Sequence, residues 1–128
     1  MRHVYVAETN ARARAEAEPH IDYFWHKLLS YHRGSMALMG QSAPPRPAQV
    51  EKAEDIPLYE LDFDLCQREG LTIIGDPDHV VREIQSQARE LGVGVLVGLF
   101  QFGSLPHALA QKNIRLFAET VLPALKRA

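Results

Sequence analysis

The residues best suited to chemistry lie in one short segment, residues 100–107. It contains a side-chain amide, Gln101, an imidazole, His107, and two aromatic rings, Phe100 and Phe102. Small-molecule sites combine apolar walls with a few polar groups that orient the ligand. Because the segment follows an apolar run, we expect it at the carboxyl end of a parallel strand, where α/β proteins bind ligands. The four side chains are the candidate binding residues. A purely structural role, in which the rings cap the core, stays open.

A second motif, Gly-Asp-Pro-Asp at residues 75–78, also follows an apolar run. A helix begins naturally here, with Asp76 as the N-cap and Pro77 in the first turn. The amino end of a helix attracts anions, but Asp76 and Asp78 already place two carboxylates there and would repel a phosphate. The motif therefore predicts a helix cap. The glycines of residues 92–98 fall within a predicted strand, so they do not form a dinucleotide-binding turn.

Metal and thiol chemistry have little support in the sequence. His20, His26 and His32 are six residues apart and cannot share one helical face. No cysteine or carboxylate completes a metal-binding set, so we expect no metal site. Cys66, the single cysteine, is expected to be a small core residue. The sequence identifies no catalytic residue.

The amino-terminal half is expected to contain a strand, a helix and an irregular segment. Residues 3–7 are rich in strand-forming side chains, and Thr9 can cap the helix that follows. Pro19 is expected to kink or break this helix near residue 18. Glycines and prolines make residues 33–57 an irregular or disordered insertion that could cover a ligand site. The expected buried face of the helix is Ala13, Ala17, Ile21, Phe24 and Leu28.

The carboxyl-terminal half alternates strands and helices. A short helix ends at Gly70, and apolar strands are expected at 71–75 and 93–99. The helix between these strands ends at Gly92, and a last helix runs over residues 107–121. The faces expected to be buried are Leu58, Leu61, Leu65 and Cys66, then Val80, Ile84, Ala88 and Leu91, and finally Ala110, Ile114, Phe117 and Val121. This alternation predicts an α/β fold with about three parallel strands and covering helices.

Composition is that of an ordinary globular protein forming one domain over residues 1–128. A net charge of −2 provides no cationic field for nucleic acid. No apolar run is long enough for a membrane span, and the amino terminus is not a signal-peptide core. We therefore expect a cytoplasmic protein. Two pairs at i,i+4 spacing, Arg12–Glu16 and Arg14–Glu18, predict ion pairs on the exposed face of the first helix.

Two segments carry a resemblance to a known family. The first reads TIIGDPDHVV from Thr72, and the second reads LFQFGSLPH from Leu99 and closes with LFAETVLPAL from Leu116. Together they resemble the carboxyl-terminal end of the bacterial-luciferase-like, flavin-dependent monooxygenases. The opening segment from Val4 is also similar to a strand and helix of that family. The resemblance implies a (β/α)₈ barrel, which needs about 250 residues, so the 128 present here would be a partial barrel, its carboxyl-terminal half.

The resemblance also implies a reaction and a cofactor. In the family, reduced FMN from a partner flavin reductase reacts with O₂, and the product oxygenates an aldehyde, sulfonate, alkane or terpene-like substrate. Phe100, Gln101, Phe102 and His107 would then be the cofactor-binding residues of this chain. The residues that grip the flavin in the family come mostly from earlier strands. The isolated chain is therefore expected to be inactive or weakly active and to bind FMN weakly or not at all.

Two alternatives stay open beside a truncated monooxygenase. One is a dimeric half-barrel that binds a small ligand or flavin without oxygenation. The other is a structural or interaction domain that keeps the fold without the site. In each case an open parallel sheet leaves apolar edges, which favours a homodimer or higher oligomer.

Overall fold

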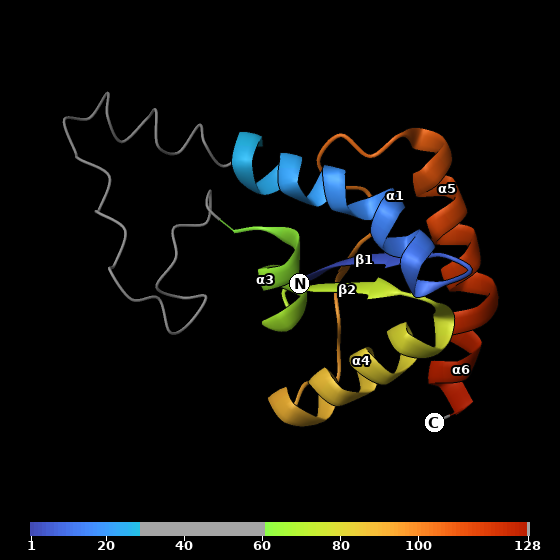
Figure 1. Ribbon diagram of the computed structural model, residues 1–128. Helices are drawn as coiled ribbons and strands as arrows, with labels where there is room; N and C mark the ends of the chain where they lie inside the picture. The colour runs from blue at the N-terminus through green and yellow to red at the C-terminus, as the bar shows by residue number, and fades with distance from the viewer. Residues whose placement is uncertain (29–60, 128) are drawn as a thin grey trace, which may run out of the picture.

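The computed structural model describes residues 1–28 and 61–127, which form a three-stranded parallel sheet with helices on both faces (Figure 1). The predicted α/β class and parallel strands are confirmed. The insertion expected at 33–57 lies outside the described residues. Along the chain the elements are β1 (Arg2–Val6), α1 (Asn10–Tyr23), the π-helical turn η1 (Phe24–Leu28), α3 (Phe63–Arg68), β2 (Thr72–Gly75), α4 (Pro77–Leu91), β3 (Gly98–Leu99), α5 (His107–Leu116), the π-helical turn η4 (Phe117–Val121) and α6 (Leu122–Arg127).

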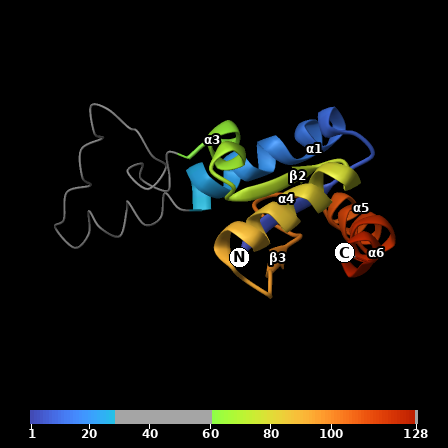
Figure 2. The ribbon, with the colours of Figure 1, turned by 90° about the horizontal axis from the view of Figure 1, so that it is seen from below.

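The strand order is β2–β1–β3, with β1 in the centre. Figure 2 shows β3 at the edge away from β2. The chain moves from β1 to β2 in one direction and then crosses back past β1 to reach β3. Right-handed crossovers in opposite directions place their helices on opposite faces, as α1 and α4 are here (Figure 1). A (β/α)₈ barrel keeps its strands in chain order, so this sheet has the order of a doubly wound fold.

Alternate residues of β1 separate the core into two layers. Tyr5 and Ala7 pack with α1 and α3, whereas Val4 and Val6 pack with α4 and the helices that end the chain. This division follows from the two-residue period of a strand. The buried members of the first layer include Ala13, Ala17, Ile21, Phe63, Cys66, Ile74, Phe102 and Ala110. Those of the second include Ile73, Val80, Ile84 and Val121.

The predicted helix caps are confirmed. The Thr9 side chain accepts a hydrogen bond from the Arg12 amide at 3.2 Å, and Asp76 accepts one from the His79 amide at 2.8 Å. Gly92 ends α4 in the left-handed conformation, with φ of 63°, which a glycine adopts without strain. No helix among the described residues combines the length and apolar character needed to cross a lipid bilayer.

Three details of the helices differ from the sequence prediction. Pro19 does not break α1, which continues to Tyr23. Leu91 and Ile114, both expected in the core, are 59% and 52% exposed. Leu91 lies in the last turn of α4, beyond the end of the short sheet. At Ile114, the neighbouring Asn113 takes the buried position instead, because its amide bonds to the sheet.

The predicted strand over residues 93–99 is mostly wrong. Only Gly98 and Leu99 pair with β1, and the three valines before them are 43%, 82% and 55% exposed. A continuous apolar run favours a strand that is covered on both faces. The described residues provide neither a neighbouring strand nor a covering helix for the outer side of this segment. Its composition fits a buried strand, but its position here is at an open edge.

Candidate functional site

The structure does not bring the four predicted binding residues together. Phe102 is 4% exposed and lies in the first core layer, with its ring centroid 5.4 Å from that of His3. Phe100 packs into the second layer, with its ring centroid 4.8 Å from that of Phe117. The two rings therefore belong to opposite sides of the sheet. Both complete the hydrophobic core, which matches the structural alternative left open by the sequence.

The two polar candidates are also separate. The Gln101 amide donates a hydrogen bond to the Leu105 carbonyl at 2.8 Å and so holds the loop after β3. His107 is exposed at the first residue of α5. A flavin ring needs an apolar wall with nearby polar groups, and these four side chains do not form one in the described chain. These four residues by themselves therefore do not form a flavin site.

A different group of side chains occupies the carboxyl end of β1, the position where doubly wound proteins bind ligands. We call it the Tyr5 cluster; it consists of Tyr5, Glu8, Arg12, Glu16 and Lys112. The Tyr5 hydroxyl donates to Glu16 at 2.9 Å, and the Lys112 ammonium contacts both Glu16 oxygens at 3.0 and 2.9 Å. Lys112 also lies 2.9 Å from Glu8, and Arg12 donates to Glu16 at 2.8 Å.

The electrostatics of the Tyr5 cluster hold each group in one protonation state. Burial and the neighbouring Glu16 carboxylate raise the pKa of Tyr5, so its hydroxyl stays protonated. Burial alone would raise the pKa of Glu16, but hydrogen bonds from Lys112, Arg12 and Tyr5 outweigh it, and the pKa is lowered. Every carboxylate in the cluster already has a cationic partner. The Tyr5 cluster is therefore a network of ion pairs that joins α1 to α5.

Asn113, next to Lys112 on α5, extends the sheet with its side chain. Its oxygen accepts from the Val6 amide at 2.9 Å, and its nitrogen donates to the Val4 carbonyl at 2.8 Å. The same nitrogen donates to the Phe100 carbonyl at 3.2 Å. Asn113 is fully buried. Its amide thus takes the place of a neighbouring strand where β3 no longer pairs with β1.

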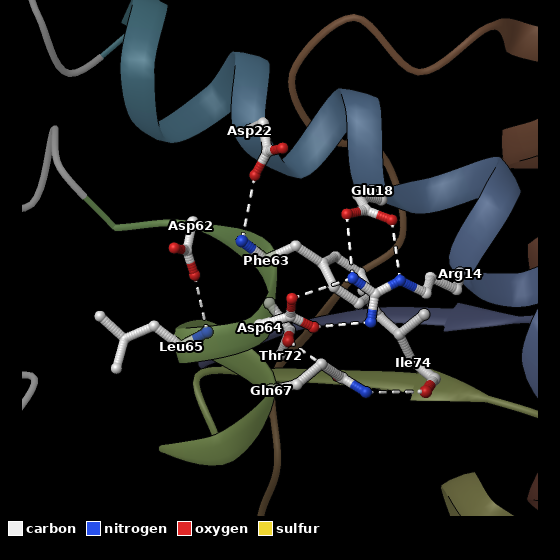
Figure 3. Close-up of polar contacts among 10 residues, drawn as sticks. All are labelled: Arg14, Glu18, Asp22, Asp62, Phe63, Asp64, Leu65, Gln67, Thr72 and Ile74. Atoms are coloured by element: carbon white, nitrogen blue, oxygen red, sulfur yellow. Dashed lines mark hydrogen bonds and ion pairs between the residues drawn. The ribbon is translucent and has the colours of Figure 1, made fainter.

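A second polar network joins α1 to α3 (Figure 3). The Arg14 guanidinium contacts both oxygens of Asp64 at 2.6 and 3.0 Å and bonds Glu18 on its own helix. Asp22 accepts from the Phe63 amide at 3.0 Å, which fixes the start of α3. Arg14 and Asp64 are exposed, Glu18 and Asp22 are partly buried, and each of the four has a hydrogen-bond or ion-pair partner. Their role is to hold α3 against α1.

Three buried side-chain nitrogens lack a hydrogen-bond partner among the described residues, namely Nε2 of His3, Nε1 of Trp25 and Nε2 of Gln87. The side chains of His3 and Trp25 lie close to each other. Both side chains are more than nine-tenths buried, and their ring centroids are 5.8 Å apart. Burial lowers the pKa of His3, which favours the neutral imidazole. Phe24 and Phe102 pack edge-on against the same imidazole. The surroundings of His3 are thus aromatic on several sides.

Two hollows lined by described residues lie at the other end of the sheet, near the amino terminus of β1. One has a volume of about 600 Å³ and lies between the second half of α4 and residues 93–96. The other, of about 410 Å³, is lined by charged and amide side chains between α3 and α4. Arg2 and Gln87 contribute to both, and the Arg2 guanidinium donates to Gln87 at 2.9 Å.

The described residues contain no group of three or more side chains that could hold a metal ion. Cys66 is buried as predicted, and burial raises the pKa of its thiol to about 12, so it is an unreactive core residue. Sequence reasoning identified the Arg12–Glu16 pair from its spacing but missed Lys112, which is 96 residues from Glu16. It also missed Asn113, because a single polar residue on a helix gives no signal of what it contacts.

Comparison with models of known protein families, and with curated proteins, finds no match for this chain.

Proposed function

We propose that this chain is the carboxyl-terminal part of a luciferase-like, FMN-dependent monooxygenase and is incomplete as an oxygenase by itself. In the complete enzyme, reduced flavin and O₂ would oxygenate a small organic substrate. The flavin supplies that chemistry when bound, and the protein supplies position and a dry environment.

The observation that carries this proposal is how the two resembling segments fold. The segment from Thr72 contains β2, the Asp76-capped turn and the first turn of α4. The segment from Leu99 leaves β3 and enters α5 at His107. These are consecutive strand–helix units, the repeating element of a barrel. The strand order differs from that of a barrel, so this proposal requires β3 to pair with a different strand in the complete enzyme.

Within this proposal, the present chain contributes packing and loop structure, and the flavin is held by the other part of the barrel. That division agrees with the positions of the candidate residues. Phe102 is buried in the core, and the Gln101 amide is already used by the Leu105 carbonyl. Asp76 and Asp78 at the start of α4 add negative charge where a phosphate would otherwise be attracted.

The test begins with the reading frame upstream of the codon for Met1. We expect an in-frame segment that encodes the remaining strands. The joined protein, supplied with a flavin reductase, FMN and NADPH, should oxygenate a long-chain aldehyde or an alkanesulfonate. The 128-residue chain under the same conditions is the matched control and should give only the background oxidation of free reduced flavin. No upstream segment, or a joined protein without product formation, would contradict the proposal.

A second candidate function is small-ligand or flavin binding without oxygenation. The doubly wound strand order favours it, because such sheets are stable with few strands and bind ligands at their carboxyl ends. FMN titration of the isolated chain separates the two candidates. Under the first proposal, flavin fluorescence should show no saturable binding at micromolar concentration. Saturable quenching in that range would favour the second candidate.

A further inference from the structure

The largest concentration of exposed apolar side chains lies at the edge of the sheet beside β3. It consists of Met1, Leu91, Val93, Val95 and Val97, and we call it the valine edge. The exposed fractions of these side chains are 73%, 59%, 43%, 82% and 55%. Five exposed large hydrophobic residues in one region are unusual on a monomeric protein and indicate an interaction surface.

Some backbone groups along the valine edge have hydrogen-bond partners and others do not. The Val93 amide donates to the Ala88 carbonyl at 3.1 Å, and the Val97 carbonyl accepts from the Arg2 amide at 2.9 Å. Among the described residues, the backbone groups of Gly94 and Leu96 have no hydrogen-bond partner. An edge with free amide and carbonyl groups can add another strand.

The side chains of the valine edge alternate as they would in a strand. Leu96 packs inward on the second core layer, while the valines on either side of it are exposed. The order Gly-Val-Gly-Val-Leu-Val-Gly over residues 92–98 is nearly the same in both directions, with Val95 in the middle. No Asp, Glu, Lys or Arg occurs between Glu90 and Lys112, so no charged side chain from this stretch opposes pairing. Natural edge strands usually carry such charges to prevent it.

We propose that the valine edge binds the same segment of a second copy of this chain, as an antiparallel strand pair with its two-fold axis at Val95. In this register Val95 faces Val95 of the second copy, and Val93 faces Val97. Gly94 lies opposite Leu96, and these two residues exchange the hydrogen bonds that are free in the single chain. The two sheets join into one of six strands, with the valines of both copies on the same face.

A second copy of this chain meets both requirements for pairing with the valine edge. A two-fold antiparallel pair needs a segment whose residue pattern is nearly the same in both directions, and residues 92–98 have such a pattern. It also needs the outward backbone groups to fall at positions that face each other. Gly94 and Leu96 meet this requirement because each lies one residue from Val95. The inference does not rest on the proposed function. It concerns the 128-residue chain by itself, whereas a complete barrel would pair this edge with its own strands.

The first experiment is sedimentation of the chain at micromolar concentration, beside Val95→Lys and Ile114→Lys. Ile114 is 52% exposed and lies on α5, so it is a matched control for adding a lysine to an exposed apolar position. We expect the unmodified chain and Ile114→Lys to be dimers and Val95→Lys to be a monomer. A monomeric unmodified chain, or a Val95→Lys variant that remains dimeric, would overturn the proposal.

The second experiment tests the register by disulfide formation. Opposed residues of a pair without hydrogen bonds are about 4.5 Å apart at Cα, within the range of a disulfide. Val95→Cys should therefore form a covalent dimer under mild oxidation. Val93→Cys alone should not, but its mixture with Val97→Cys should. The unmodified chain controls for Cys66, which is buried. If Val93→Cys and Val97→Cys each cross-link alone as well as Val95→Cys does, the pairing is parallel and the proposed two-fold arrangement is wrong.

Discussion

The two sides of the central strand β1 are built in different ways. On the β2 side, four consecutive residue pairs run from His3 opposite Thr72 to Val6 opposite Gly75. On the β3 side, pairing stops after two, Arg2 opposite Gly98 and His3 opposite Leu99. Beyond that point the Asn113 side chain makes the hydrogen bonds that a strand would make. The same strand is therefore supported by repeated backbone contacts on one side and by a single side chain on the other.

This difference predicts where the fold is most sensitive to substitution. Strand pairing is spread over many backbone groups and depends little on any one side chain. Asn113 concentrates three hydrogen bonds to buried or partly buried groups in one residue. Substitutions on the β3 side should therefore have larger effects than matched substitutions on the β2 side.

The largest effect is expected for Asn113→Leu. It leaves the Val6 amide and the Val4 carbonyl buried without partners, each at a cost of about 1–3 kcal/mol. The free energy of unfolding should fall by about 3–5 kcal/mol in urea titrations. Asn113→Asp keeps an acceptor for the Val6 amide but places a buried carboxylate against the Val4 and Phe100 carbonyl oxygens, so at neutral pH its loss should be at least as large.

The control for Asn113→Leu is Gln111→Ala, at an exposed position on the same helix. It should change the free energy of unfolding by less than about 0.5 kcal/mol. If Asn113→Leu were as mild as this control, the amide would not be supporting β1.

A second large effect is expected for Gly103→Ala, in the loop that leaves β3. Gly103 has a φ of 53°, and a Cβ there would lie 2.1 Å from the His20 carbonyl oxygen, which is backbone and cannot move aside alone. Strain and overlap together should cost about 2–3 kcal/mol in urea titrations. Gly70→Ala is the matched control, because Gly70 has a similar φ of 66° but a Cβ there meets only the far end of the Gln87 side chain. Equal losses in both variants would show that the loop does not pack against α1 as described.

The same contrast explains what the sequence could and could not predict. Residues whose signals are local were predicted correctly. Thr9, Asp76 and Gly92 begin or end helices through their own backbone and side-chain preferences. The β1 and β2 strands were also found, because their apolar runs are buried on both faces.

The failures occurred where the outcome depends on distant residues. The valines of residues 93–97 form a strand only if a neighbour is present, and the described chain provides none on that side. Phe100 and Phe102 were grouped in one candidate site because both follow the last strand, but they lie in opposite core layers. Lys112 and Asn113 act across more than ninety residues of sequence, and spacing along a helix contains no information about such contacts.

A smaller effect is expected on the β2 side for Asp76→Ala. This substitution removes the hydrogen bond from the His79 amide that caps α4, and caps of this kind contribute about 1 kcal/mol. Thermal or urea unfolding should show a loss of about that size. Asp78→Ala is the control, because it removes a carboxylate from the same turn but no capping bond, and a few tenths of a kcal/mol are expected. A larger loss at Asp78 than at Asp76 would contradict the cap.

The smallest effect is expected from the Tyr5 cluster and should appear as a dependence on pH. The pKa of Glu16 is lowered in the folded chain, so its stabilisation is fully present above its unfolded pKa near 4.5 and is lost as pH falls through the folded value. His3 also has a lowered pKa, but its contribution is lost as pH falls below about 6.5, a separate window.

Glu16→Gln should therefore reduce the loss in free energy of unfolding below about pH 4.5. The loss that His3 causes below about pH 6.5 should be unchanged. At neutral pH the expected loss is less than about 1 kcal/mol, because the Arg12 partner of Glu16 is 61% exposed to solvent. Urea titrations between pH 3 and pH 7 measure both windows in one series. Glu119→Gln is the control, since it makes the same change at an exposed carboxylate outside the Tyr5 cluster. If the free energy of unfolding of Glu16→Gln fell with pH as steeply as that of the unmodified chain, the Tyr5 cluster would add no net stability. Asn113 alone would then support this side of β1.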